Sequence, residues 1–152
     1  MSLDKFDKKI LQELQQNGRI SNVELAGRLN LSESACLRRV KSLEDSDYIE
    51  SYTALLNQKN MGLTDTVFVH IVLRREEQTE LAAFESAIKK IPEVMECYLM
   101  TGEFDYLLRI VVSNMADYER LHSESLTRLP GIARVNSSFA IRTVRKTSQL
   151  PI

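Results

Sequence analysis

Three cationic side chains, Arg38, Arg39 and Lys41, lie close together in a segment whose apolar residues repeat at helical spacing. An arginine carries a planar fork of donors that matches two acceptor atoms of guanine in the major groove of DNA, and we assign such a base contact to Arg38. Arg39 and Lys41 are better suited to phosphate groups, and Ser32 and Ser34 are further candidates for phosphate contacts. This chemistry predicts a DNA-binding helix.

A helix over residues 32–45 is needed to position these side chains. Its apolar spacing turns Ala35, Val40 and Leu43 inward, with Arg39 near the boundary between the buried and exposed faces. The candidate DNA-binding residues are Ser32, Glu33, Ser34, Leu37, Arg38, Arg39 and Lys41. The same cationic side chains would also suit a solvated helix face in a protein that does not bind DNA, so the segment alone leaves both interpretations open.

Two further helices are expected before residue 32. Apolar residues follow helical spacing across residues 3–17, and Gly18 is placed to end that helix. Ser21 and Glu24 have the spacing of a capping box, in which each side chain accepts from a backbone N–H at the other position. Asn30 tolerates left-handed backbone and suits a tight turn. The residues expected on the buried face of the second helix are Val23, Ala26 and Leu29. Three helices with a tight turn before the last are typical of a helix-turn-helix domain.

The pattern changes at residue 66, where apolar residues begin to alternate as they do in a β-strand. One face of this strand carries Val67, Val69, Ile71 and Leu73, and the other carries Thr66, Phe68, His70 and Val72. The elements expected next are a helix ended by Pro92, strands over residues 94–100 and 105–112, a helix capped by Asn114, a strand over residues 132–145, and a tail over residues 146–152. The order β-α-β-β-α-β predicts a ferredoxin-like sheet with two helices on one face.

The chain is therefore expected to be an α+β protein with two domains. Residues 1–60 form the three-helix helix-turn-helix domain with a linker, and residues 61–152 form the βαββαβ domain. Because both helices of the second domain cover the same face of the sheet, the other face, with Phe68 and Val72, needs a partner. We expect a second copy of the chain to cover it, which makes the protein a homodimer.

Composition restricts the class of protein further. Lys and Arg total 20 and Asp and Glu total 21, so the formal net charge is −1 and any DNA-binding surface must be a local patch. Cys36, Cys97, His70 and His122 lack the spacing of a zinc site or a disulfide framework, so no metal or cofactor is expected. The sequence contains neither a stretch long and apolar enough to span a membrane nor an N-terminal signal segment. We therefore expect a cytoplasmic protein.

Several motifs occur together, in the order in which they stand in a known family. They are RISNVEL at residues 19–25, CLRRVKSLE at 36–44, YTALLN at 52–57, TGEFDYLL at 101–108 and TRLPGI at 127–132. With these motifs, nearly the whole chain resembles the Lrp/AsnC (feast/famine) family of transcription regulators. It departs from the family pattern at Asn30 and Asp47, where relatives often carry glycine, and at Glu33 and Ala35, where they often carry proline.

This resemblance implies what each domain does. The N-terminal domain would bind double-stranded promoter DNA, and the C-terminal domain would bind a free amino acid as effector. Members of the family dimerise through their sheets and often assemble into octamers, so the resemblance also implies a higher homo-oligomer. Several weakly basic units arrayed along one DNA segment would add their phosphate contacts, which fits the balanced charge of the chain.

The resemblance further implies an effector site, which must bind an ammonium group, a carboxylate and a side chain. Asp105 can pair with the ammonium, and backbone N–H groups around Thr101 and Gly102 can hold the carboxylate. Leu99 and Met115 favour an apolar effector such as leucine or methionine. By similarity the site also includes Ser138, Phe139, Ala140 and Ile141. Each residue has a structural alternative, because Asp105 can bind only local backbone and Leu99 and Met115 can belong to the core.

Three other functions are weighed against this interpretation. An enzyme would carry a nucleophile elbow, a P-loop or a dinucleotide-binding fingerprint, and the sequence shows none, so no catalytic residue is assigned. An RNA-binding module with the same order of elements would carry an aromatic motif on its central strands, which is missing here. An amino-acid sensor that acts through protein partners, without specific DNA binding, stays open as the alternative function.

Overall fold

The computed structural model describes residues 2–75 and 77–152, and its contacts divide the chain into two compact units. The first unit extends to Leu55 and also contains Arg145–Ile152, while the second comprises Leu56–Val144. The sequence pattern assigned residues 146–152 to the second domain as a tail, whereas the structure packs them with the first unit. The first unit is therefore built from both ends of the described chain.

Three helices form most of the first unit: α1 (Lys5–Gln16), α2 (Asn22–Leu29) and α3 (Glu33–Asp45). Each begins at a side chain that accepts hydrogen bonds from the first turn, namely Asp4, Ser21 and Ser32. The buried apolar residues that these helices share are Ile10, Leu11, Leu25, Ala26, Leu29, Cys36 and Leu43. This small core holds the three helices together and confirms the predicted helix-turn-helix arrangement.

Local details of the first unit differ from the expectation at three positions. Glu24 does not complete a capping box, because its carboxylate pairs with Arg28 one turn later at 2.7 Å. Val23 is exposed and Leu25 is buried in its place, since the buried stripe of α2 is rotated relative to the predicted one. At the end of α1 an extended Asn17 is the C-cap, and Gly18 does not adopt the left-handed conformation.

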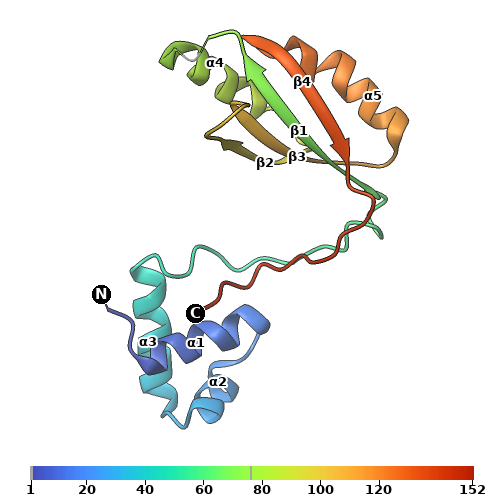
Figure 1. The fold of residues 1–152 in the computed structure, drawn as a ribbon. Coiled ribbons are helices and arrows are strands. Elements are labelled where there is room, and N and C mark those ends of the chain that lie inside the picture. The colour runs from blue at the N-terminus through green and yellow to red at the C-terminus, as the bar shows by residue number, and fades with distance from the viewer. Residues whose placement is uncertain (1, 76) are drawn as a thin grey trace. The chain divides into compact units, whose positions relative to one another are not determined.

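The second unit is a four-stranded antiparallel sheet with two α-helices (Figure 1). The strands are β1 (Asp65–Leu73), β2 (Val94–Leu99), β3 (Tyr106–Val112) and β4 (Ile132–Phe139), in the spatial order β2-β3-β1-β4. The helices are α4 (Gln78–Ile88) and α5 (Met115–Glu124), followed by a 3₁₀ turn at Leu126–Arg128. The predicted ferredoxin-like order is confirmed.

The alternation along β1 separates a buried face of the sheet from an open one. Val67, Val69 and Ile71 are fully buried against both helices, whose inner residues include Phe84 and Tyr118. On the opposite face, Phe68 is 37% exposed, and neither helix of the second unit covers it. The sheet therefore has one face in the core of the second unit and one that this unit leaves uncovered.

The last strand is shorter than predicted, ending at Phe139 instead of continuing to residue 145. Its partner β1 begins at Asp65, and the last hydrogen bond of the pair runs from the Ala140 N–H to the Thr66 carbonyl at 2.9 Å. Beyond that point β4 has no neighbouring strand to pair with, so the chain leaves the sheet.

Among the described residues there is no helix with the length and apolar character that crossing a membrane requires.

The turn between α2 and α3 provides a first prediction. Asn30 has a φ of 53°, as the sequence suggested, and its N–H and that of Leu31 close the end of α2. Asn30→Val places a branched side chain in left-handed backbone and should lower the free energy of unfolding of the first unit by about 1–2 kcal/mol. Asn30→Gly is the matched control and should not destabilise. Urea unfolding followed by helical circular dichroism measures both, and equal stability of the two variants would contradict the prediction.

Candidate nucleic-acid interface and effector site

The start of α3 displays the residues predicted to contact DNA. Every residue of that set except Arg39 is exposed. The Ser32 hydroxyl accepts a hydrogen bond from the Ala35 N–H at 3.3 Å and lies 3.3 Å from the Ser34 hydroxyl, so Ser32 serves first as the helix cap. Arg38 and Lys41 lie three positions apart on the exposed side of the helix, where both cations are accessible. This surface can approach a nucleic acid.

Arg39 faces the body of the unit instead of the solvent. Its Nη1 donates to Asp4 Oδ2 at 2.8 Å and to Asp7 Oδ1 at 2.7 Å, and its guanidinium carbon lies 5.4 Å from the centre of the Phe6 ring. The Asp7 side chain is 9% exposed, while those of Arg39 and Asp4 are 29% and 49% exposed, so this ion pair is partly buried. Arg39 therefore has carboxylate partners at the start of α1 within the same unit. The sequence had instead suggested that Arg39 contacts a DNA phosphate.

The first turn of α1 is organised around the same carboxylates. Asp4 and Asp7 form a reciprocal capping box, in which each side chain accepts from the backbone N–H of the other. Hydrogen bonds from the Asp7 N–H and from Arg39 hold the pKa of Asp4 below its usual value. One network therefore caps α1 and ties it to the middle of the candidate recognition helix.

Two residues that position α3, Asp7 and Asn22, were not among the site residues predicted from the sequence. Asn22 acts at the turn before α3. Its Nδ2 donates to the Glu33 carbonyl at 2.9 Å, which joins the first residue of α2 to the first residue of α3. Sequence spacing offered no signal for this contact, because the side chain crosses the turn between two helices. The signal for Asp7 was its position three residues after the N-cap Asp4, which is the spacing of a capping box.

The candidate effector loop lies between β2 and β3. The Asp105 carboxylate accepts a hydrogen bond from the Leu73 N–H at 2.6 Å, and the Asp105 N–H donates to the Ile71 carbonyl at 2.9 Å. Asp105 therefore anchors the loop to the end of β1, 32 positions away, and not to the local backbone that its structural alternative named. Gly102 has a φ of 118°, and nothing lies within 4 Å of the position that a Cβ atom would occupy. The loop backbone is open to close approach at this point.

The predicted effector residues fall into two groups at opposite ends of the sheet. Leu99, Thr101, Gly102 and Asp105 belong to the end where Ile71 pairs with Tyr106. Met115, Ser138, Phe139, Ala140 and Ile141 belong to the end where Val67 pairs with Phe139. Val67 and Ile71 are roughly 14 Å apart at about 3.4 Å per residue of strand, more than one amino acid spans. A single copy of the chain does not bring the full set together.

Burial distinguishes the roles of individual residues in the two groups. Leu99 is 59% exposed and Met115 is 60% exposed, so neither is a core residue in a single copy. Phe139 is partly buried and packs edge-on against the Tyr118 ring, with centroids 5.3 Å apart, so it belongs to the core. The apolar side chains at Leu99 and Met115 are available for contact with a ligand or another copy.

Comparison with known proteins decides the family. The sequence model described as the Lrp/AsnC ligand-binding domain matches residues 66–150, and the model described as a winged helix-turn-helix DNA-binding domain matches residues 3–50. The chain belongs to the Lrp/AsnC family. It is therefore a DNA-binding transcriptional regulator with an amino-acid-responsive domain, and the family is one of regulators and not of enzymes. The alternative of a sensor that does not bind DNA is not favoured.

Individual relatives cover almost the entire chain. The leucine-responsive regulatory protein of Escherichia coli strain K12 is 43% identical over 150 residues, which are 99% of this chain and 92% of the relative. A transcriptional regulator from Neisseria meningitidis, solved in complex with L-methionine, has a TM-score of 0.94 at 39% identity, covering 99% of this chain and 97% of that one. An AsnC family regulator from Agrobacterium tumefaciens has a TM-score of 0.94 at 34% identity, covering 98% and 97%.

The adjacent arginines of α3 provide a matched pair of substitutions. Arg39→Met leaves the buried Asp7 carboxylate without its cation and should lower the free energy of unfolding by about 1–3 kcal/mol. Arg38→Met makes the same change in charge on the exposed face and should alter stability by no more than about 0.5 kcal/mol. Urea denaturation of the full chain measures both. Equal losses in the two variants would show that the Arg39 network does not hold α1 to α3.

Proposed function

We propose that α3 enters the major groove of promoter DNA and that Arg38 reads a base edge there. The carrying observation is the exposed stripe formed by Ser34, Arg38 and Lys41, which follow the spacing of one helix face. Lys41 and the serine hydroxyls contact phosphate groups, and Leu37 is placed for an apolar contact with a thymine methyl group. In this arrangement the first unit is the DNA-binding domain and the second is the regulatory and oligomerisation domain.

We also propose that the working form is a homodimer that assembles further, with an octamer as the expected state. Two features support this oligomer: the open face of the sheet around Phe68 and the separation of the effector residues at opposite ends of the sheet. A second copy that joins opposite ends would complete the effector site. Two copies also provide two recognition helices for a roughly palindromic operator, which compensates for the absence of a net positive charge.

The proposed effector is an apolar amino acid, leucine or methionine. The names of the leucine-responsive relative and of the L-methionine complex support this choice, together with the exposed apolar side chains of Leu99 and Met115. Asp105 supplies the negative charge for the ammonium group while its Oδ2 stays bound to the Leu73 N–H. No cofactor is proposed, and we propose a cytoplasmic location because the partner is promoter DNA.

Regulation in this proposal is a shift between assemblies. An effector that binds between copies favours the assembly in which its site is complete, and a difference in affinity of about 1–3 kcal/mol suffices to change promoter occupancy. The direction of the effect on transcription depends on where the operator lies relative to the promoter.

The DNA contact is tested by removing Arg38. Arg38→Ala should weaken binding by about 1–3 kcal/mol to a duplex that the wild-type protein selects from a random pool, and should relax the preference for one base pair. Fluorescence anisotropy against the selected and a scrambled duplex measures the loss. Lys90→Ala, which removes an equal charge from the regulatory domain, is the control and should bind normally. Wild-type protein that selects no sequence would favour the sensor without specific DNA binding.

The effector contact is tested by Asp105→Asn. The amide oxygen of asparagine can still accept from the Leu73 N–H, whereas the charge that pairs with the ammonium is lost. In the wild-type protein, leucine or methionine at about 100 times its dissociation constant should add roughly 2.7 kcal/mol of stability. Thermal-shift measurement should show this gain in the wild type and little of it in the variant.

Two outcomes would contradict the effector proposal. One is an equal gain in Asp105→Asn, which would remove Asp105 from the site. The other is a monomer mass in light scattering, with and without amino acid, because a monomer keeps the two groups of effector residues apart. A panel of all common amino acids shows in the same measurement whether the preference is for apolar side chains.

A further inference from the structure

The segment Arg145–Ile152 docks on α1 through its backbone. The carboxamide of Gln15 pairs with the peptide groups of Leu150 in both directions: Nε2 donates to the Leu150 carbonyl at 3.2 Å, and Oε1 accepts from the Leu150 N–H at 2.5 Å. One turn earlier, Gln12 Nε2 donates to the Ile152 carbonyl at 2.6 Å. Gln12 and Gln15, three positions apart on one helix, therefore bind the backbone of residues 152 and 150, which are alternate residues of an extended segment.

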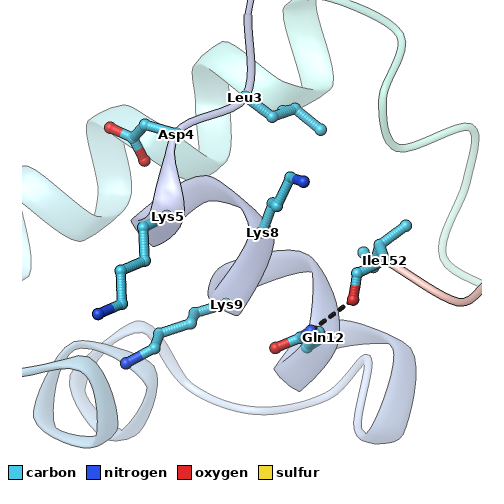
Figure 2. A pocket seen from close by; sticks show the side chains of 7 residues that line it. All are labelled: Leu3, Asp4, Lys5, Lys8, Lys9, Gln12 and Ile152. Atoms are coloured by element: carbon cyan, nitrogen blue, oxygen red, sulfur yellow. Dashed lines mark hydrogen bonds between the residues drawn. The ribbon is translucent and has the colours of Figure 1, made fainter.

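Figure 2 shows the Gln12 contact at the edge of a hollow of about 460 Å³. The hollow is lined by Ile152, by Leu3 and Asp4 before the helix, and by the lysines of the first two turns of α1. The side chains of the docked segment contribute little burial, since Leu150 is 70% exposed. A few solvent-accessible hydrogen bonds therefore provide most of the attachment, and such contacts open more readily than a buried core.

The docked segment follows the proposed effector residues closely in the chain. It follows the end of β4, where Ser138 and Ile141 belong to the proposed effector site, and only residues 142–144 separate Ile141 from Arg145. Residues 138 and 139 lie in β4 and the Ala140 N–H bonds to the Thr66 carbonyl, so an effector that contacts residues 138–141 would constrain the point from which the segment starts and how often it meets α1. On the other side, α1 is tied to the recognition helix by the contacts of Asp4 and Asp7 with Arg39.

We propose that residues 145–152 form a reversible strap through which the effector site acts on the DNA-binding helices. The strap is held by Gln12 and Gln15 and transmits the state of residues 138–141 to α1 and, through Arg39, to α3. This inference rests on the proposed effector site and DNA contact, and it adds the route that connects them. By linkage, DNA binding alters the occupancy of the strap to the same degree that the strap alters DNA binding.

Gln15→Ala in the full chain tests the strap, with Gln16→Ala as the matched control on the same helix. Gln16 is exposed, and no hydrogen bond from its side chain to the strap occurs among the described residues. The first readout is hydrogen exchange of the peptide that contains Leu150, measured by mass spectrometry on a millisecond scale. We expect faster exchange at Leu150 in Gln15→Ala than in the wild type and in Gln16→Ala, because the variant removes the acceptor for that N–H.

The second readout is the ratio of DNA dissociation constants with and without saturating leucine or methionine. We expect a ratio of roughly 5–150 in the wild type and in Gln16→Ala, and a ratio at least threefold nearer to one in Gln15→Ala. Thermal unfolding of both variants near that of the wild type shows that the domain has kept its fold. Gln12→Ala combined with Gln15→Ala should extend the same change.

Two results would overturn the strap. Equal exchange at Leu150 in the wild type and in Gln15→Ala would show that the segment is not docked in solution. Faster exchange in the variant with an unchanged effector ratio would show that docking does not transmit the signal. A failure of the proposed function is distinct from both, because it appears in the wild-type protein itself as an absence of DNA binding or of any effector ratio.

Discussion

The sheet of the second unit buries only one of its two faces, and this constraint shapes the rest of the protein. Helices α4 and α5 cover the face that carries Val67, Val69 and Ile71, while Phe68 stays partly exposed on the other. An apolar sheet face in water is unfavourable, which is why we propose that another copy covers it. The antiparallel order also places the β2–β3 loop and the end of β4 at opposite ends of β1. In the proposed oligomer, the assembly that covers the open face would also bring together the candidate effector residues that one copy holds apart.

Two neighbouring arginines on α3 have different roles because a helix turns its side chains by about 100° per residue. Arg38 faces the solvent, whereas Arg39 reaches the carboxylates of Asp4 and Asp7. The candidate recognition surface of α3 thus keeps fewer exposed cations than the sequence suggests. With a formal net charge of −1, one copy has little general attraction for DNA, and in the proposed oligomer several copies would add their contacts to the same DNA segment.

The DNA-binding unit is made from both ends of the described chain. Helix α1 is held on one side by the ion pairs to Arg39 and on another by the hydrogen bonds from Gln12 and Gln15 to the segment after β4. The first attachment is partly buried, and the second is exposed and opens more readily. Helix α1 thus has a partly buried attachment to α3 and an exposed attachment to residues 150 and 152, and the proposed strap acts through the exposed one.

The sequence by itself determined the features that depend on neighbouring residues. Helix caps at Ser21 and Asn114, the left-handed turn at Asn30 and the alternation along β1 were all predicted correctly, because each is set by side chains within a few positions. The tertiary structure decided the contacts between distant residues: Arg39 with Asp7, 32 positions apart, Asp105 with Leu73, also 32 apart, and Gln15 with Leu150, 135 apart. It also decided where β4 ends, because a strand continues only as far as its neighbour does. Local patterns carry no information about which distant groups meet, since that depends on how the elements pack.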